Sequence, residues 1–339
     1  MKEVGIGVIG AGRIGKLHGD NLCRSVAGAR VEAAAEINLN DEHRAWAEKN
    51  GIKKIYKDPA EIWKDPKIDA VFICSSTDTH ADFIMEAAAA GKHIFCEKPI
   101  HTDVKKIKEA LAAVEKAGVK LQVGFVRRFD HNHKKVHDAV ASGILGSPHV
   151  VRITSRDPEG PPLSYIAVSG GIFMDMTIHD FDMARYLSCS EVAEVSAYGA
   201  VLIDQDYRQY GDVDTAAVML KFENGALGLI DNSRAAHYGY DQRTEVHCAK
   251  GCVQAANDLV DASVISTAEG VVCEKPMWFF LERYNAAFIS EARVFVDAVR
   301  NDAVPPVGGK DGLEAVYIAM AAARSLKENR PVKLSEVRQ

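Results

Sequence analysis

The sequence predicts an α/β protein with two domains, and three observations support this prediction. Up to residue 124, apolar segments typical of buried strands alternate with segments typical of helices, which indicates βαβ units and a parallel sheet. Beyond that point, strand-like alternations follow one another with few helices between them, which indicates an α+β domain with a large, mainly antiparallel sheet. The 339 residues are enough for both. We therefore expect one domain over 1–124 and a second over 125–339.

The first domain begins with a strand-like run and a glycine-rich turn. Residues 4–9 are apolar and residues 14–25 are typical of a helix. Between them, Gly10, Gly12 and Gly15 give the pattern G-x-G-x-x-G. In this pattern the first glycine allows a tight turn, the second lets the backbone approach a pyrophosphate, and the third lets the helix pack closely on the strand. The helix N-terminus then faces the phosphates with its positive end. This context predicts a Rossmann dinucleotide-binding domain; a glycine turn in an unrelated α/β protein is the alternative.

An acidic residue lies where such a domain binds the ribose hydroxyls of the cofactor. Glu36 follows the apolar run 31–35, about 20 positions after Gly15. A carboxylate there accepts hydrogen bonds from ribose hydroxyls and repels a 2′-phosphate, which predicts NAD rather than NADP. Arg13 is a complication, since a cation beside Gly12 is able to reach that phosphate. The residues expected at the cofactor are Gly10, Gly12, Arg13, Ile14, Gly15, Glu36, Ser75, His80, Glu97 and Lys98.

The remaining elements of the first domain follow in order. Strands are expected over 55–56, 68–74, 93–96 and 121–124. A helix is expected over 41–50, a second begins at residue 60, and a third follows residue 80 and runs through residue 90. A fourth runs from 103 to 117, and Asn40 and Asp103 are the expected caps of the first and fourth helices. Ligands bind parallel sheets at the carboxyl ends of the strands, near the switch point. The candidate loops therefore follow Ile9, Ala35, Cys74, Cys96 and Gly124.

The second domain is expected to combine strands with a few helices. Strands are predicted over 150–155, 192–201, 215–222, 226–230 and 244–248. Helices are predicted over 131–141, 174–187, 282–299 and 312–328. The sequence Glu223-Asn224-Gly225 is a hairpin signal between two of the strands.

The composition excludes several classes of protein. A net charge of −6 provides no basic surface for nucleic acid. No apolar run is long enough to span a bilayer, and the chain runs directly into a strand without a secretory signal. The 7 cysteines are scattered and odd in number, which favours a reduced, cytoplasmic compartment. We therefore expect a small-molecule ligand and neither a nucleic acid nor a membrane as partner.

Lys98 is the first candidate for chemistry. It lies in Cys96-Glu97-Lys98-Pro99, at the end of a predicted parallel strand where a substrate should bind. An ammonium group there donates to a substrate oxygen, and Pro99 holds the turn, with a cis bond as one possibility. A solvated lysine that begins a loop is the alternative.

Asp175 and His179 form the second candidate. On one helix they are four positions apart and share a face, whereas Asp180 and Asp182 point elsewhere. A histidine titrates near neutrality, so it is able to take the proton of an alcohol while a hydride leaves. A nearby carboxylate orients the ring or binds a second hydroxyl. An acid-rich helix start with one surface histidine is the alternative.

These three features together resemble the glucose–fructose oxidoreductase / inositol dehydrogenase (Gfo/Idh/MocA) family over essentially the whole chain. Residues 95–99, 122–130 and 238–241 look closest to bacterial inositol 2-dehydrogenases. The resemblance implies Lys98, Asp175 and His179 as the catalytic set. It implies substrate contacts at Lys98, Val126, Arg127, Asp157, Asp175, Met176, His179 and Tyr240. Four residues depart from the pattern. Glu36 stands where many members have Asp, Asp157 stands where some inositol enzymes have Asn, and Val126 and Met176 also differ. These departures leave the polyol open.

The activity implied is NAD-dependent oxidation of a secondary hydroxyl of a cyclic polyol, myo-inositol at C2, to 2-keto-myo-inositol (scyllo-inosose). His179 would be the base, Lys98 would polarise the reacting oxygen, and Asp175 would bind a hydroxyl. No metal is needed because nicotinamide takes the hydride. Another inositol isomer or an aldose is the alternative substrate, and a non-catalytic nucleotide-sensing regulator is the alternative class. The family also implies a homotetramer built on the second-domain sheets.

Two groups of residues outside these motifs are further candidates for ligand binding. His131, His133 and His137 suggest a metal site, but no carboxylate arrangement accompanies them, so we interpret them as surface histidines. Trp278 and Phe279 either stack on a substrate ring or belong to the core.

Overall fold

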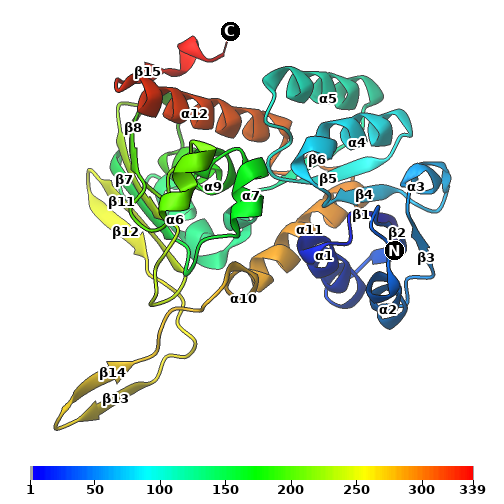
Figure 1. Cartoon of the computed structure of the whole chain (residues 1–339), viewed down its shortest axis with the longest axis horizontal. Helices are drawn as coiled ribbons and strands as arrows, with labels where there is room; N and C mark the ends of the chain where they lie inside the picture. Colours follow the sequence, from blue (N-terminus) through cyan, green and yellow to red (C-terminus); the bar gives the residue numbers. More distant parts are fainter. Residues whose placement is uncertain (1–2, 339) are drawn as a thin grey trace. The chain divides into compact units, whose positions relative to one another are not determined.

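The computed structural model describes residues 3–338, which form two compact units (Figure 1). The first unit contains the described residues up to Val126 together with Ala287–Leu313. The second contains Arg127–Ala286 and the described residues from Glu314 onward. The expected boundary at 124 differs from this division mainly in the segment 287–313. That segment groups with the first unit because Ala292, Phe295 and Val296 join its apolar core.

The first unit is built on a six-stranded sheet with the order β3-β2-β1-β4-β5-β6, and all its pairs are parallel. The parallel sheet predicted for this part is confirmed. Its strands are β1 (Val4–Ile9), β2 (Ala29–Ala35), β3 (Lys54–Tyr56), β4 (Ala70–Ile73), β5 (His93–Glu97) and β6 (Leu121–Gly124). The strand order reverses between β1 and β4, which is where such sheets bind ligands.

Helices cover both faces of this sheet, with α4 and α5 on one side and α1 and α11 on the other (Figure 1). The helices are α1 (Arg13–Arg24), α2 (Asp41–Lys49), α3 (Ala60–Lys64), α4 (Thr77–Ala89), α5 (Val104–Ala117) and α11 (Asn285–Arg300). Two predicted caps are confirmed: Asn40 accepts from the His43 N–H, and Asp103 accepts from the Lys105 N–H. Gly118 ends α5 with φ +66°.

The second unit is built on a seven-stranded sheet with the order β12-β11-β7-β10-β9-β8-β15. Among the described strands of this sheet, only β7 and β10 pair in parallel, so the mainly antiparallel prediction is confirmed. The strands are β7 (Pro148–Arg156), β8 (Val192–Ala200), β9 (Thr215–Phe222), β10 (Leu227–Ser233), β11 (Asp241–Cys248), β12 (Gly251–Ala255) and β15 (Val332–Lys333). The predicted turn at Gly225, with φ +88°, joins β9 to β10.

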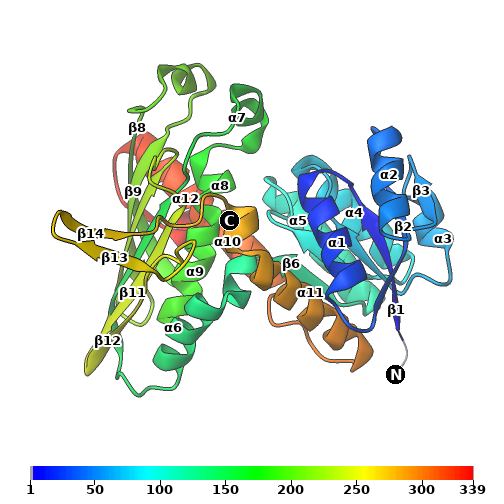
Figure 2. The ribbon, with the colours of Figure 1, turned by 90° about the horizontal axis from the view of Figure 1, so that it is seen from below.

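Helices cover one face of this second sheet (Figure 2). The helical segments are η1 (Val126–Phe129), α6 (His131–Ala141), α7 (Leu163–Ser169), α8 (Ile172–Asp175), α9 (Ile178–Ser188), η2 (Gln205–Tyr210), α10 (Phe280–Arg283), α12 (Gly309–Glu328) and η3 (Leu334–Glu336). Along β9 the burial alternates, with Val218 and Leu220 buried and Met219 exposed. The sheet therefore has an inner face against helices and an outer face open within this chain.

Two predicted helices are divided in the structure, and one hairpin was not predicted. The helix expected over 174–187 is split into α8 and α9, because the Thr177 hydroxyl bonds to the Ile172 carbonyl (3.2 Å) and to Asn232 Oδ1 (2.8 Å). The helix expected over 282–299 is likewise divided into α10 and α11. An exposed hairpin, β13 (Val264–Thr267) with β14 (Gly270–Cys273), was not expected. None of the helices formed by residues 3–338 is long and apolar enough to cross a membrane.

Candidate active site

The glycine turn between β1 and α1 is shaped for a ligand. Gly10 has φ +86°, and a Cβ there would lie 2.6 Å from the Ser75 nitrogen. A Cβ on Gly15 would overlap the Gly10 carbonyl oxygen, so packing alone requires glycine at both positions. A Cβ on Gly12 would meet no atom within 4 Å. The absence of a side chain at Gly12 thus leaves room for close approach of a pyrophosphate, and the turn fits a dinucleotide.

Glu36 lies beside this turn at the end of β2. Its Oε2 accepts from the Ala11 N–H at 2.8 Å, and its Oε1 accepts from the Asn38 N–H at 3.0 Å. The carboxylate is therefore held next to the turn, as the ribose-binding prediction requires. Arg13 begins α1 and is exposed, and Ile14 is half-buried behind it.

His80 connects the loops that follow β4 and β5. The side chain is 1% exposed, with Nδ1 2.8 Å from the Pro99 carbonyl and Nε2 3.0 Å from the Ser75 carbonyl. Burial lowers the pKa of His80, so a neutral ring donates to one of the two carbonyls. The Ser75 hydroxyl hydrogen-bonds to Thr79 at 2.7 Å. His80 thus braces these loops, and direct contact of Ser75 and His80 with the cofactor stays a prediction.

Lys98 is half-buried directly after β5, and the peptide bond to Pro99 is cis. The preceding Glu97 is buried, with Oε1 2.8 Å from His18 Nε2 on α1. Glu291 of α11 lies 3.9 Å from the same nitrogen, and burial, followed by the charge of Glu97, raises the pKa of the Glu291 carboxyl well above its usual range. Glu97 therefore anchors the strand end that carries Lys98; no spacing in the sequence pointed to His18 or Glu291.

The prediction that Asp175 and His179 share one helix was wrong: Asp175 ends α8 and His179 lies at the start of α9, because the helix breaks at Thr177. Both residues are half-buried. Asp175 Oδ1 accepts from the Tyr165 hydroxyl at 2.8 Å, and its Oδ2 accepts from Arg234 Nη1 at 3.1 Å. The sequence did not point to Tyr165 or Arg234, because neither belongs to a motif or shares a helix with Asp175. The carboxylate is thus oriented by two donors from distant segments.

Arg127 lies in a buried polar network of the second unit. Its Nη1 donates to Asp180 Oδ1 at 2.5 Å and its Nη2 to Ser155 Oγ at 3.2 Å. Asn232 donates to the other Asp180 oxygen at 2.8 Å. Asp182 pairs instead with Arg128, at 2.6 and 2.7 Å, so Asp180 and Asp182 each bond to an arginine, a pairing that the sequence had not indicated. Substrate contact by Arg127 stays a prediction.

The remaining predicted substrate residues are largely enclosed. Burial raises the pKa of Asp157 to about 6, Arg234 opposes this shift, and Asp175 adds to it. Tyr240 is 7% exposed and its ring meets Tyr284 edge-on, with centroids 5.9 Å apart. Met176 and Val126 are buried. Their contacts with a substrate stay predictions.

The interpretation of the three histidines needs one correction. His131 is exposed, but His133 is buried between Thr244 and Tyr284, both at 3.3 Å, and burial lowers its pKa to about 4. It is a core histidine rather than a surface one, because its α6 face packs on the sheet. His137 stacks on the Tyr186 ring at 3.7 Å. Trp278 is 46% exposed and so does not belong to the core.

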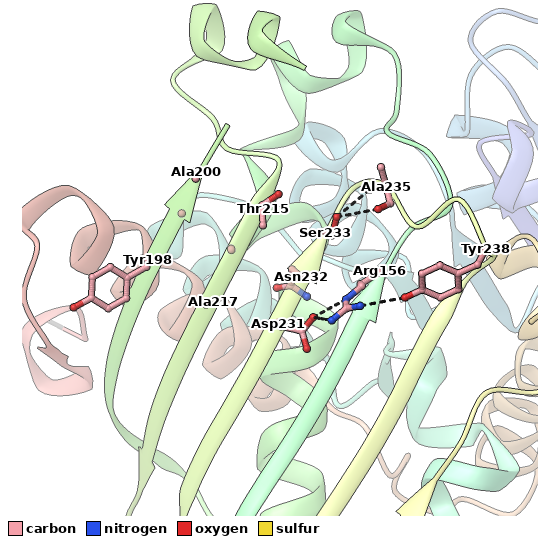
Figure 3. Close-up of a pocket in the computed structure, with 12 residues that line it drawn as sticks. Arg156, Tyr198, Ala200, Thr215, Ala217, Asp231, Asn232, Ser233, Ala235 and Tyr238 are labelled. Atoms are coloured by element: carbon pink, nitrogen blue, oxygen red, sulfur yellow. Dashed lines mark hydrogen bonds and ion pairs between the residues drawn. The ribbon is translucent and has the colours of Figure 1, made fainter. Parts of the chain in front are cut away.

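The outer face of the second sheet carries a hollow of about 460 Å³ (Figure 3). Arg156 bonds to Asp231 at 2.7 Å and to the Tyr238 hydroxyl at 3.1 Å along its floor. Tyr198, Thr215 and Ala217 of the neighbouring strands also line it. None of the predicted catalytic residues lines this hollow, but Asn232, which donates to Asp180 in the Arg127 network, is one of its lining residues.

A parallel nucleotide-binding sheet with its glycine turn, and an α+β unit that carries an acid and a histidine, together define a nicotinamide-dependent oxidoreductase. Comparisons with known proteins agree. The oxidoreductase family with an NAD-binding Rossmann fold matches residues 4–125, and the GFO/IDH/MocA C-terminal domain matches residues 133–254. The chain belongs to the Gfo/Idh/MocA oxidoreductase family, and the predicted fold and NAD binding are confirmed.

Individual relatives extend over nearly the whole chain. Myo-inositol 2-dehydrogenase of Thermotoga maritima is 49% identical over 98% of this chain and 99% of its own length. Inositol 2-dehydrogenase of Rhizobium meliloti is 44% identical over 98% and 99%. The structure of scyllo-inositol dehydrogenase from Lactobacillus casei with bound NAD(H) and scyllo-inositol is 30% identical, has a TM-score of 0.91, and covers 98% of this chain and 100% of its own.

Proposed function

We propose that the protein oxidises a secondary hydroxyl of a cyclic polyol with NAD, and that its substrate is myo-inositol, which becomes 2-keto-myo-inositol. The similarity over 98% of the chain to a myo-inositol 2-dehydrogenase carries this proposal. The polar groups Lys98, Asp175 and Arg127 suit a ligand that has a hydroxyl on every carbon. A site that pairs hydroxyls discriminates strongly, because a missing hydroxyl leaves buried polar groups without partners.

We assign the steps of the reaction to residues of this chain. The glycine turn and the N-terminus of α1 hold the pyrophosphate, and Glu36 accepts from the ribose hydroxyls. His179 takes the hydroxyl proton, Lys98 donates a hydrogen bond to the reacting oxygen, and Asp175 accepts from a neighbouring hydroxyl. The nicotinamide of bound NAD supplies the acceptor for the hydride.

The substrate is tested by mixing the protein with NAD and a panel of polyols and following the absorbance of reduced nicotinamide. Myo-inositol is expected to give the highest kcat/KM in the panel. Faster turnover of scyllo-inositol would favour the isomer that the Lactobacillus casei enzyme is named for. Faster turnover of an aldose would favour a sugar dehydrogenase. Tight NAD binding without turnover of any member would favour a nucleotide-sensing regulator, which has no need for Lys98, Asp175 and His179 together.

The Glu36→Ser variant is expected to shift the coenzyme preference from NAD toward NADP. The Glu36 carboxylate places a negative charge beside the ribose, and like-charge repulsion of a 2′-phosphate costs on the order of a few kcal/mol. Without it, the positive charge of Arg13 attracts the phosphate. The measurement is kcat/KM for both coenzymes, with Glu42→Ser, an exposed acid on α2, as the matched control. Equal efficiency of the unaltered protein with both coenzymes would contradict the assignment.

We also propose a homotetramer in the cytoplasm. The outer face of the second sheet exposes apolar side chains that a partner subunit would cover, namely Tyr198, Met219, Leu227 and Leu229. The hairpin β13–β14 likewise exposes Val264, Ile265, Val271 and Val272. All seven cysteines are free thiols, which suits a reducing compartment. Light scattering measures the assembly, and a monomeric mass would contradict it.

A further inference from the structure

Arg234 is a buried cation at the site whose donors are only partly used. It follows β10, is 1% exposed, and its backbone N–H donates to the Asp214 carbonyl at 2.9 Å. Nη1 donates to Asp175 Oδ2 at 3.1 Å. Nε and Nη2 are buried and have no hydrogen-bond partner within residues 3–338. Buried polar groups are normally paired, so this side chain has a role that packing alone does not explain.

Asp157 is tied to the same segment. Its backbone N–H donates to the Ser233 carbonyl at 2.9 Å, and its carbonyl accepts from the Ala236 N–H at 2.7 Å. These two bonds flank Arg234 in the sequence and hold the end of β7 against it. The charges of Arg234 and Asp175 both act on the Asp157 carboxyl, in opposite directions. One buried guanidinium therefore bonds to Asp175 and acts through its charge on Asp157, and the family resemblance implies substrate contacts for both acids.

We propose that Arg234 is a positioning residue of the dehydrogenase, which orients the Asp175 carboxylate and balances the charge of Asp157 so that both acids accept hydrogen bonds from hydroxyls of one polyol. This inference rests on the proposed function. An arginine suits the task because it stays charged when buried and its planar donors keep a fixed geometry.

The charge balance predicts a pH dependence with a definite sign. Burial raises the pKa of Asp157 to about 6, and the positive charge of Arg234 keeps it from rising further. Below this pH the carboxyl binds a proton and loses its capacity as a charged acceptor. Removal of Arg234 raises that pKa, so the acid limb of the rate profile moves to higher pH. The other charged and titratable groups that act on Asp157 and Arg234 are Asp175, Arg127, Asp180, Tyr240 and Tyr207.

The test compares Arg234→Gln with Arg234→Lys and with the double variant Arg234→Gln/Asp157→Asn. For Arg234→Gln, KM for myo-inositol is expected to rise roughly 10- to 100-fold, the loss typical of a charge-assisted hydrogen bond. The acid limb is expected to move up by about one pH unit or more. Arg234→Lys should restore the acid limb, and Asp157→Asn in the double variant should recover part of KM by removing the unbalanced acid. Arg208→Gln, at an exposed arginine of η2, is the matched control.

A second readout keeps this test independent of turnover. Carboxyl NMR with ¹³C-labelled aspartate follows the titration of Asp157 directly, and Asp157→Asn assigns its signal. The pKa of Asp157 is expected to be higher in Arg234→Gln than in the unaltered protein, whether or not a polyol is oxidised. An unmoved titration and an unmoved KM overturn the inference. The inference is also overturned if Arg234→Gln destabilises the protein and neither Arg234→Lys nor the double variant restores that stability. Absence of polyol turnover in the unaltered protein with a shifted titration instead overturns the proposed function alone.

Discussion

The His179→Ala variant is expected to oxidise myo-inositol with kcat roughly 10²–10⁴-fold below that of the unaltered protein, the range for loss of a general acid–base group. His179 is half-buried at the start of α9 and lies four positions after Asp175 in the sequence. Without the ring, the hydroxyl proton has no acceptor while the hydride leaves. The rate of the unaltered protein should rise with pH as the base loses its proton. The part of this rise that depends on His179 should be lost in the variant, and the part that depends on Asp157 should remain.

NAD affinity, measured by fluorescence, separates this effect from a binding defect. It should change little, because His179 belongs to the second unit and the pyrophosphate turn to the first. His131→Ala, at an exposed ring, is the matched control and should turn over normally. Near-normal turnover in His179→Ala would remove His179 from the mechanism and leave Asp175 or Lys98 as the base.

The Lys98→Met variant is expected to lower kcat by a similar factor, roughly 10²–10⁴-fold. Methionine keeps the length of the side chain but removes the donor to the reacting oxygen. The position of Lys98, half-buried after β5 and braced by the bond of Glu97 to His18, suits a fixed donor better than a solvated lysine. Steady-state oxidation of myo-inositol measures the effect. The nicotinamide should also be held less firmly, since Lys98 follows a strand of the cofactor sheet.

A control variant at a second lysine separates the effect of losing this hydrogen-bond donor from the effect of losing one positive charge. Lys105→Met removes an ammonium group from α5 that is 84% exposed and should leave turnover unchanged. Equal rates for Lys98→Met and Lys105→Met would support the alternative of a solvated lysine. A large loss in Lys98→Met alone would support the donor.

Local chemistry explains why most elements could be predicted from the sequence. The apolar run before Gly10 is stable only when it is buried, as it is in a central parallel strand. The strand β1 covers the predicted residues 4–9. Asn40 and Asp103 satisfy orphan N–H groups at helix starts, so both helices begin where a cap was predicted. Gly225 supplies the positive φ of a hairpin turn.

Where a prediction failed, a distant contact overrode the local pattern. The helix over 174–187 breaks because Thr177 bonds to Asn232, a residue of β10 that lies 55 positions away. His133 is buried because α6 turns that face to the sheet, which a run of three histidines does not reveal. The segment 287–313 groups with the first unit because Phe295 packs against Phe72 and Phe95.

Short-range patterns in the sequence predicted the dinucleotide turn and the acid after β2 and, together with the family resemblance, the three residues proposed for catalysis. The partners of these residues depend on the tertiary structure. Arg234 meets Asp175 across 59 positions and His18 meets Glu97 across 79. Such pairs form because packing buries their polar groups together, and a buried polar group without a partner is costly. No local pattern encodes them, since they depend on which strands become neighbours.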